Sequence, residues 1–114
     1  MGLQLSVRHA GDVVVVDLQG KATIGRASEI LNIQLRQLID DGTNKILVNL
    51  TDVTQLDSSS ISTLVRAFVS LKNRGASLKL LRPSGNVRLV LETLHLLDAI
   101  PSGEDEAQVI SSFR

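Results

Sequence analysis

Apolar and polar residues alternate at the start of the chain, a pattern typical of β-strands. The alternation over residues 3–7 predicts a half-buried strand. Gly11-Asp12 then predicts a hairpin turn, and the β-branched run over residues 13–18 predicts its antiparallel partner. We expect Gly20 to break that second strand.

The spacing of apolar residues changes to three and four over residues 27–41, which predicts a helix. Gly42 stands where a helix C-cap belongs. Residues 46–50 are a short apolar run that predicts a strand covered on both faces, and a second helix follows and closes at Gly75. The expected apolar faces of the two helices are Ala27, Ile30, Leu31, Leu35, Leu38 and Ile39, and Ile61, Leu64, Val65, Phe68 and Leu71.

The last third of the chain again places helical patterns after strand-like runs. Residues 78–81 predict a strand, and Pro83-Ser84 ends it and begins a third helix. A brief segment at residues 99–100 precedes the last helix, whose start has capping-box spacing from Ser102 to Asp105. The expected apolar faces are Val87, Val90, Leu91 and Leu94, and Ala107, Ile110 and Phe113.

These elements predict one α/β domain over residues 1–114, in the order β-β-α-β-α-β-α-β-α. Helix-length connections imply mainly parallel strands joined by right-handed crossovers, whereas the tight first turn implies one antiparallel pair. We find no internal repeat and no linker. The prediction is therefore a mixed, mainly parallel sheet of about five strands with about four helices packed on it.

Composition narrows the function classes. Apolar residues make up 43% of the chain but aromatic residues only 2%, so a reader of single-stranded nucleic acid would lack stacking platforms. Twelve basic and twelve acidic residues cancel, which removes the electrostatic footprint of a nucleic-acid or membrane binder. There is no cysteine, and we see no secretory signal or membrane span. We expect a cytoplasmic protein.

Residues 56–63 hold the densest group of potentially functional side chains in the sequence. Four serines, one threonine and one carboxylate lie there, between a predicted strand and a predicted helix. Hydroxyls at such a junction are small, exposed and next to free backbone N–H groups. This setting suits a covalent switch better than a core.

Catalysis finds little support in the sequence. A serine hydrolase would place its nucleophile in a Gly-x-Ser-x-Gly turn, which is absent, and no motif places His9 or His95 beside the serines. Two distant histidines also make a poor metal set. A phosphoaspartate receiver domain could use Asp52 after a strand, but it needs an acidic pair after its first strand, and Asp40-Asp41 lies at a helix end. We predict no enzyme activity, no metal and no cofactor.

The run Asp57-Ser58-Ser59-Ser60-Ile61 resembles the junction of the STAS domain in bacterial anti-sigma factor antagonists, which usually reads Asp-Ser-Ser-Gly followed by Ile or Leu. The resemblance extends in order through residues 20–25, 45–53, 74–80 and 87–91. It implies the STAS fold. Ser60 stands where the family usually has glycine, and its side chain could block the backbone of a partner.

The resemblance implies partner switching in transcription regulation. The unphosphorylated antagonist binds an anti-sigma factor that is also a serine kinase, and this kinase phosphorylates the first serine of the motif, here Ser58. A PP2C-type phosphatase restores the active form. The chain itself would be a monomer or weak dimer. The competing interpretation is a STAS interaction module or scaffold subunit of another signalling assembly, unconnected with a sigma factor.

The expected partner-binding residues are Thr23, Ile24, Gly25, Asp57, Ser58, Ser59, Ser60 and Ile61. Without the resemblance, Thr23 reads as a loop hydroxyl and Ile24 as core. Asp57 is either a helix N-cap or a group that orients the acceptor hydroxyl, and the two roles are compatible. Ser59 and Ser60 are expected to be surface or capping hydroxyls. Asp52 is expected to be a solvated loop residue, with a ligand or a cap as the alternative roles.

Overall fold

The structure is a computed structural model that describes residues 2–22 and 26–113. Its elements follow the predicted order, with one short 3₁₀ turn in addition. They are β1 (Leu3–Ala10), β2 (Val13–Ala22), α1 (Arg26–Asp40), β3 (Lys45–Leu56), α2 (Ser58–Asn73), β4 (Ser77–Leu81), α3 (Gly85–Thr93), η1 (Leu96–Asp98), β5 (Ser102–Gly103) and α4 (Glu106–Ser112).

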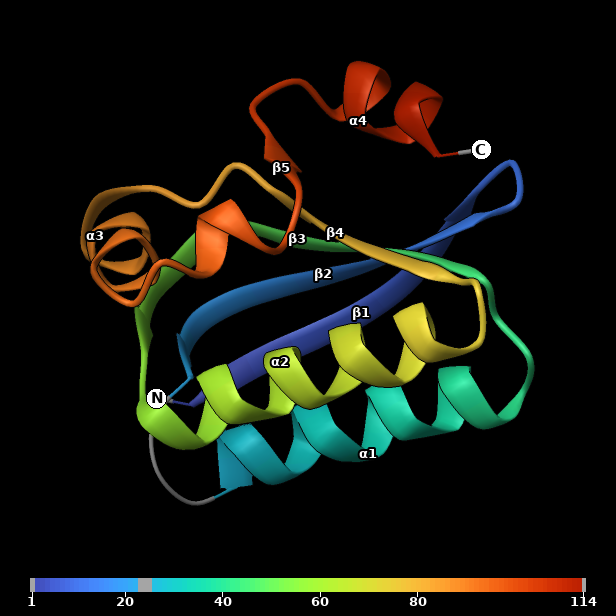
Figure 1. The fold of residues 1–114 in the computed structure, drawn as a ribbon. Coiled ribbons are helices and arrows are strands. Elements are labelled where there is room, and N and C mark those ends of the chain that lie inside the picture. The colour runs from blue at the N-terminus through green and yellow to red at the C-terminus, as the bar shows by residue number, and fades with distance from the viewer. Residues whose placement is uncertain (1, 23–25, 114) are drawn as a thin grey trace.

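One five-stranded sheet, in the order β1-β2-β3-β4-β5, organises the molecule. Strands β1 and β2 pair antiparallel, and the remaining neighbours pair in parallel. Helices α1 and α2 lie side by side on one face of the sheet, and α4 lies on the other (Figure 1). The predicted α/β class, the antiparallel first pair and the parallel remainder are confirmed.

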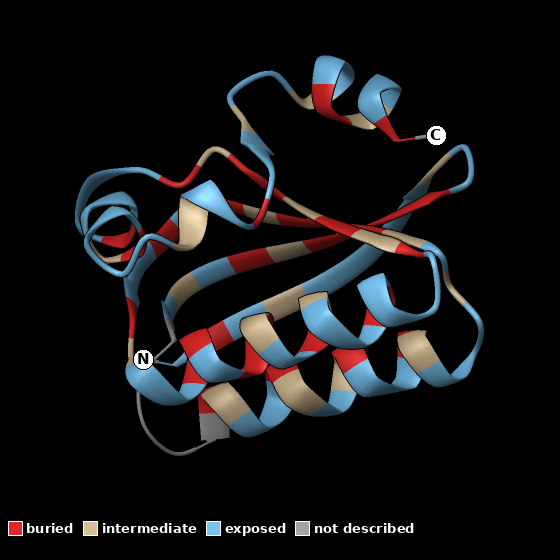
Figure 2. Ribbon diagram, in the orientation of Figure 1, coloured by how far each residue is buried: buried red, intermediate tan, exposed pale blue. Residues whose placement is uncertain are grey.

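The core has two parts because helices cover both faces of the sheet. Buried residues concentrate on the sheet and on the sides of α1 and α2 that face it (Figure 2). Ile46, Val48 and Leu50 of β3 belong to this larger cluster. On the opposite face, Leu47 of β3 joins a smaller cluster under α4. That smaller cluster comprises Val13, Val15, Leu47, Leu81, Val109 and Phe113.

Strands β2 and β3 run further than the sequence indicated. The register pairs Asp17 with Asn49 and Gln19 with Asp52, so two steps along β2 match three along β3. The extra residue is a β-bulge, and a second shift follows after Gly20. Gly20 therefore does not end β2. It adopts a φ of +102°, and a Cβ there would lie 2.7 Å from the carbonyl oxygen of Gly2, so only glycine fits the bend.

Several predicted helix faces are also corrected. Ile30 and Leu94 are 42% and 52% exposed, although the other predicted positions of these two faces are buried or partly buried. The last helix begins later than predicted, because Asp105 is its N-cap and accepts a hydrogen bond from the N–H of Gln108. Ser102 instead belongs to β5, and it is Val109 rather than Ala107 that packs inward beside Phe113.

An arginine links the first strand to the last helix. The Arg8 guanidinium donates to Asp17 of β2 at 2.6 and 3.2 Å, and to Glu106 of α4 at 3.0 and 2.5 Å. These hydrogen bonds hold the pKa of Glu106 below its usual range. Partial burial raises the pKa of Asp17, but hydrogen bonds from Arg8 and Asn49 outweigh it and the net shift is downward.

This arrangement predicts an acid-sensitive attachment of α4. Both carboxyl groups have a lowered pKa in the folded state, so their contribution to the free energy of unfolding is present above the ordinary carboxyl pKa of about 4. It is lost as the pH falls through the folded-state values. We expect Arg8→Gln to lower the free energy of unfolding by about 1 kcal/mol at pH 7.

Urea titrations at a series of pH values test this, because the difference between Arg8→Gln and wild type should shrink in acid. Arg88→Gln is the control, since Arg88 is about as exposed as Arg8 but its contacts with Glu92 and Glu104 are longer, at 3.4 Å. Its effect should stay below about 0.5 kcal/mol. A difference for Arg8→Gln that persists unchanged below pH ~3 would exclude the carboxylates as its cause.

Candidate functional site

The β3–α2 junction is held by Asp57, the residue between the two elements. Asp57 has an extended backbone, and its Oδ1 accepts a hydrogen bond from the N–H of Ser60 at 2.8 Å. Its carbonyl accepts from the N–H of Ile61 at 3.0 Å. The predicted N-cap role is confirmed. The second role suggested for Asp57, orienting an acceptor hydroxyl, stays a prediction.

The other carboxylate oxygen of Asp57 is in a different state. Oδ2 is buried and, among the residues that the structure describes, has no hydrogen-bond donor. Asp57 lines a hollow of about 270 Å³ together with Gln55, Leu56, Asn86 and Val90. A buried acceptor without a hydrogen bond lowers the stability of the folded state. The junction therefore contains a hydrogen-bonding group that the fold does not use.

The three consecutive serines face different ways. Ser58 and Ser59 are exposed in the first turn of α2, whereas Ser60 is fully buried. Ile61 is also buried, at 8% exposure. Of the two settings expected for Ser60, a surface or a capping hydroxyl, the surface one is therefore wrong. The burial of Ile61 agrees with its place on the predicted apolar face of this helix. Ser60 lies on the side of α2 that also buries Ile61 and Leu64, so the apolar face of the helix determines this rotation.

The remaining hydroxyls of the cluster divide in the same way. Thr63 is buried, and its Oγ1 donates to the carbonyl oxygen of Ser59 at 3.0 Å. Ser62 is exposed. Among the described residues, the backbone N–H groups of Ser58 and Ser59 have no hydrogen-bond partner. The exposed end of α2 thus presents two hydroxyls and two free N–H groups, an environment that favours an added negative charge.

Thr23, Ile24 and Gly25 lie outside the described residues, so their predicted part in binding stays a prediction. The strand before them ends next to the junction, because Ala22 of β2 pairs with Leu56 of β3.

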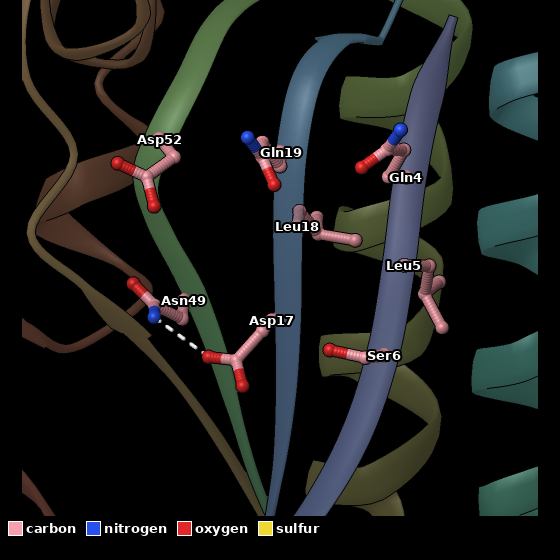
Figure 3. Close-up of a pocket in the computed structure, with 8 residues that line it drawn as sticks. All are labelled: Gln4, Leu5, Ser6, Asp17, Leu18, Gln19, Asn49 and Asp52. Atoms are coloured by element: carbon pink, nitrogen blue, oxygen red, sulfur yellow. Dashed lines mark hydrogen bonds between the residues drawn. The ribbon is translucent and has the colours of Figure 1, made fainter.

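Asp52 is placed differently from its prediction. It lies within β3 rather than after a strand, and its exposed side chain borders a shallow polar pocket of about 220 Å³ on the open face of the sheet (Figure 3). Asp17 and Asn49 meet in the same pocket, joined by a 2.7 Å hydrogen bond. The polar residues Gln4 and Ser6, at alternate positions of β1, already indicated that one face of the sheet is open. The sequence does not reveal the β-bulge, so it could not show that Asp52 lies on that face.

Other chemistry is sparse in the part of the chain that the structure describes. Over residues 2–22 and 26–113, no three His, Cys, Asp or Glu side chains are grouped so that they could hold a metal ion. None of the helices described is both long and apolar enough to cross a membrane. The β3–α2 junction is therefore the site on which we base a function.

The cap geometry predicts separate effects for the shape and the charge of Asp57. Asp57→Ala removes the acceptor for the Ser60 N–H and should lower the free energy of unfolding by about 1 kcal/mol in urea titrations. Asp57→Asn keeps a capping oxygen while removing the charge, so its loss should be smaller. Equal losses for the two variants would contradict a role based on the cap hydrogen bond.

Comparison with known proteins agrees with the fold. A family model described as the STAS domain matches residues 4–109. A search of curated proteins finds no match. Among solved structures, an anti-sigma factor antagonist from Mycobacterium paratuberculosis is 16% identical, with 98% of this chain and 94% of that chain covered and a TM-score of 0.86.

The anti-sigma factor antagonist SpoIIAA in its unphosphorylated form is 20% identical, with 95% of this chain and 96% of that chain covered and a TM-score of 0.76. The Bacillus cell fate determinant SpoIIAA in its phosphorylated form is 21% identical, with coverages of 95% and 97% and a TM-score of 0.75. At these identities the structures show a shared fold. The family match over nearly the whole sequence shows that the chain belongs to the STAS domain family.

Proposed function

We propose that this chain is an anti-sigma factor antagonist whose binding to an anti-sigma factor with serine kinase activity is switched by phosphorylation of Ser58. A PP2C-type phosphatase would reverse the modification, and the chain would catalyse nothing itself. The observation that carries the proposal is the exposed Ser58 hydroxyl at the first position of a capped helix. Similarity to anti-sigma factor antagonists supports the class of partner. Because the donor is ATP, we place the switch in the cytoplasm.

The helix N-terminus explains how the fold would tolerate a phosphoryl group. Phosphorylation adds about −1.5 to −2 charges and three strong acceptor oxygens. The free N–H groups of Ser58 and Ser59, with the positive end of the helix dipole, favour an anion there. Since the acceptor side chain is exposed, the added group displaces no packed atom. The modified chain would remain folded.

A partner seated on the same turn would be less tolerant. It would meet a hydrated dianion next to the Asp57 carboxylate, so electrostatic repulsion and desolvation would both oppose binding. A coupling of about 1–3 kcal/mol corresponds to roughly a 5- to 150-fold loss of affinity. The switch would thus act by excluding the partner.

The direction of the serine side chains narrows the proposed binding surface. Ser58 and Ser59 offer exposed side chains, with Asp57 beside them, and Thr23 to Gly25 would complete the surface from the end of β2. The buried side chains of Ser60 and Ile61 would not contact the partner but would hold the turn in place from inside the protein. Because Ser60 points into the protein, its hydroxyl would not obstruct the backbone of a partner.

Substitution of the acceptor tests the proposal. With the anti-sigma factor kinase of the same organism and ATP, we expect phosphate on Ser58 by peptide mapping, and none on Ser58→Ala. Ser58→Ala should bind the kinase as tightly as the unphosphorylated wild type. Ser58→Asp should bind about 5- to 150-fold more weakly in a titration. Ser59→Ala and Ser62→Ala are matched controls, which should still be phosphorylated.

Phosphate on another residue, or full-strength binding by Ser58→Asp, would contradict the assignment of Ser58. Failure of the wild type to bind that kinase at all would favour a STAS module in another signalling assembly.

The family usually has glycine at position 60. Because Ser60 is buried, we predict that Ser60→Gly changes the stability of the fold but not the affinity for the kinase. Ser60→Gly should leave kinase affinity within about twofold, because the hydroxyl does not face the proposed surface. The same change should lower the free energy of unfolding by about 0.5–1 kcal/mol, since glycine is unfavourable inside a helix. A large gain in affinity without loss of stability would show that Ser60 does obstruct the partner.

A further inference from the structure

A groove runs along the seam between α1 and α2, starting beside the proposed switch. One hollow of about 300 Å³ lies between the first turns of the helices and is lined by Ser59 and Glu29 among others. A second hollow of about 320 Å³ continues along the seam as far as Val69 and Ser70. The two share the lining residues Asn32, Thr63 and Arg66, so they form one continuous groove.

The floor and the rim of this groove differ in chemistry. Its apolar lining is Leu35, Ile39, Val65, Ala67 and Val69. Two cations lie along it, Arg36 from α1 and Arg66 from α2. Val69 is 45% exposed, so part of the apolar lining is open to solvent. A partly apolar groove with cations along it suits an amphipathic segment with acidic residues.

Among the arginines whose side chains the structure describes, Arg36 and Arg66 make the fewest hydrogen bonds and ion pairs. Within residues 2–22 and 26–113, Arg36 has no hydrogen bond or ion pair, and Arg66 has only a 3.3 Å hydrogen bond to Thr63. By contrast, Arg8 and Arg88 contact carboxylates, and Arg74 donates to backbone carbonyls. A guanidinium offers five donors in a planar fork that fits a carboxylate.

We infer that the groove between α1 and α2 docks an acidic, amphipathic segment of the anti-sigma factor kinase, with carboxylates of that segment on Arg36 and Arg66. The inference rests on the proposed function and assigns its second contact surface. Charge complementarity selects an acidic occupant, and continuity of the groove with Ser59 places that occupant next to the switch. Glu29 lies at the junction end of the groove, so the acidic residues of the segment would lie further along the seam.

The groove and the β3–α2 junction would make different contributions to binding of the kinase. The junction contact would be lost on phosphorylation, whereas Ser58 does not line the groove and the groove arginines keep their charge. Docking through the groove would therefore hold the kinase close to its acceptor serine and fix the orientation of the complex. Because its rim charges are exposed, the groove should affect the association rate and the salt dependence strongly.

Charge reversal tests this role with a matched control in the same helix. Arg66→Glu and Arg36→Glu should each weaken binding of the unphosphorylated chain to the kinase by about tenfold, mainly through slower association, and should flatten the salt dependence. Lys72→Glu makes the same charge change on α2, but Lys72 lies over the Phe68 ring rather than in the groove. It should change the affinity less than about twofold. Arg66→Gln and Arg36→Gln provide neutral versions if a reversed charge disturbs folding.

The outcomes separate this inference from the proposed function. If Ser58→Asp weakens binding of the kinase but neither arginine variant does, docking in the groove is contradicted. The phosphorylation switch at Ser58 is then still supported. If Lys72→Glu lowers the affinity for the kinase as much as the arginine variants do, the loss is caused by the overall charge of the chain. That result would also contradict docking in the groove. Sedimentation of the chain alone decides the occupant, because self-association that Arg66→Glu abolishes would assign the groove to a second copy. If the wild type binds no kinase, both proposals fall.

Discussion

Burial of β3 on both faces and pairing along both of its edges determine where the functional site lies. Ile46, Leu47 and Val48 are fully buried, and β2 and β4 flank them in parallel. A one-residue slip would turn Leu47 and its neighbours to the wrong faces, so the register is strongly specified. The end of β3 is therefore fixed, and Asp57 begins α2 directly after it. The exposure of Ser58 follows from that register and from the cap.

The sequence was sufficient for the element order because each helix has a clear apolar stripe and each strand a run of apolar or alternating residues. It was insufficient for the length of β3, since Thr51 and Asp52 look like a polar loop when read alone. They continue the strand because two bulges let β3 follow β2 to its end. The bend requires glycine at position 20 because the carbonyl oxygen of Gly2 lies close by, and no local sequence pattern can reveal that contact.

The chemical type of the site could be predicted, whereas the direction of its side chains could not. An acidic residue before three serines indicates a cap, and the structure has that cap. Ser58 and Ser60 are both serines, yet one is exposed and the other buried, because helix rotation at the cap decides their environment. Arg36 and Arg66 gave no signal in the sequence. They share a groove only because α1 and α2 lie side by side on the sheet.

The central claim is that a phosphoryl group on Ser58 is accepted by the fold and rejected by the partner. The most direct measurement compares fully phosphorylated and unphosphorylated chain, recording backbone amide shifts and affinity for the same anti-sigma factor kinase. We expect amide changes confined to the start of α2 and its neighbours, with affinity about 5- to 150-fold lower for the phosphorylated chain. Equal affinities would contradict the account, as would amide changes that spread through the β3 core.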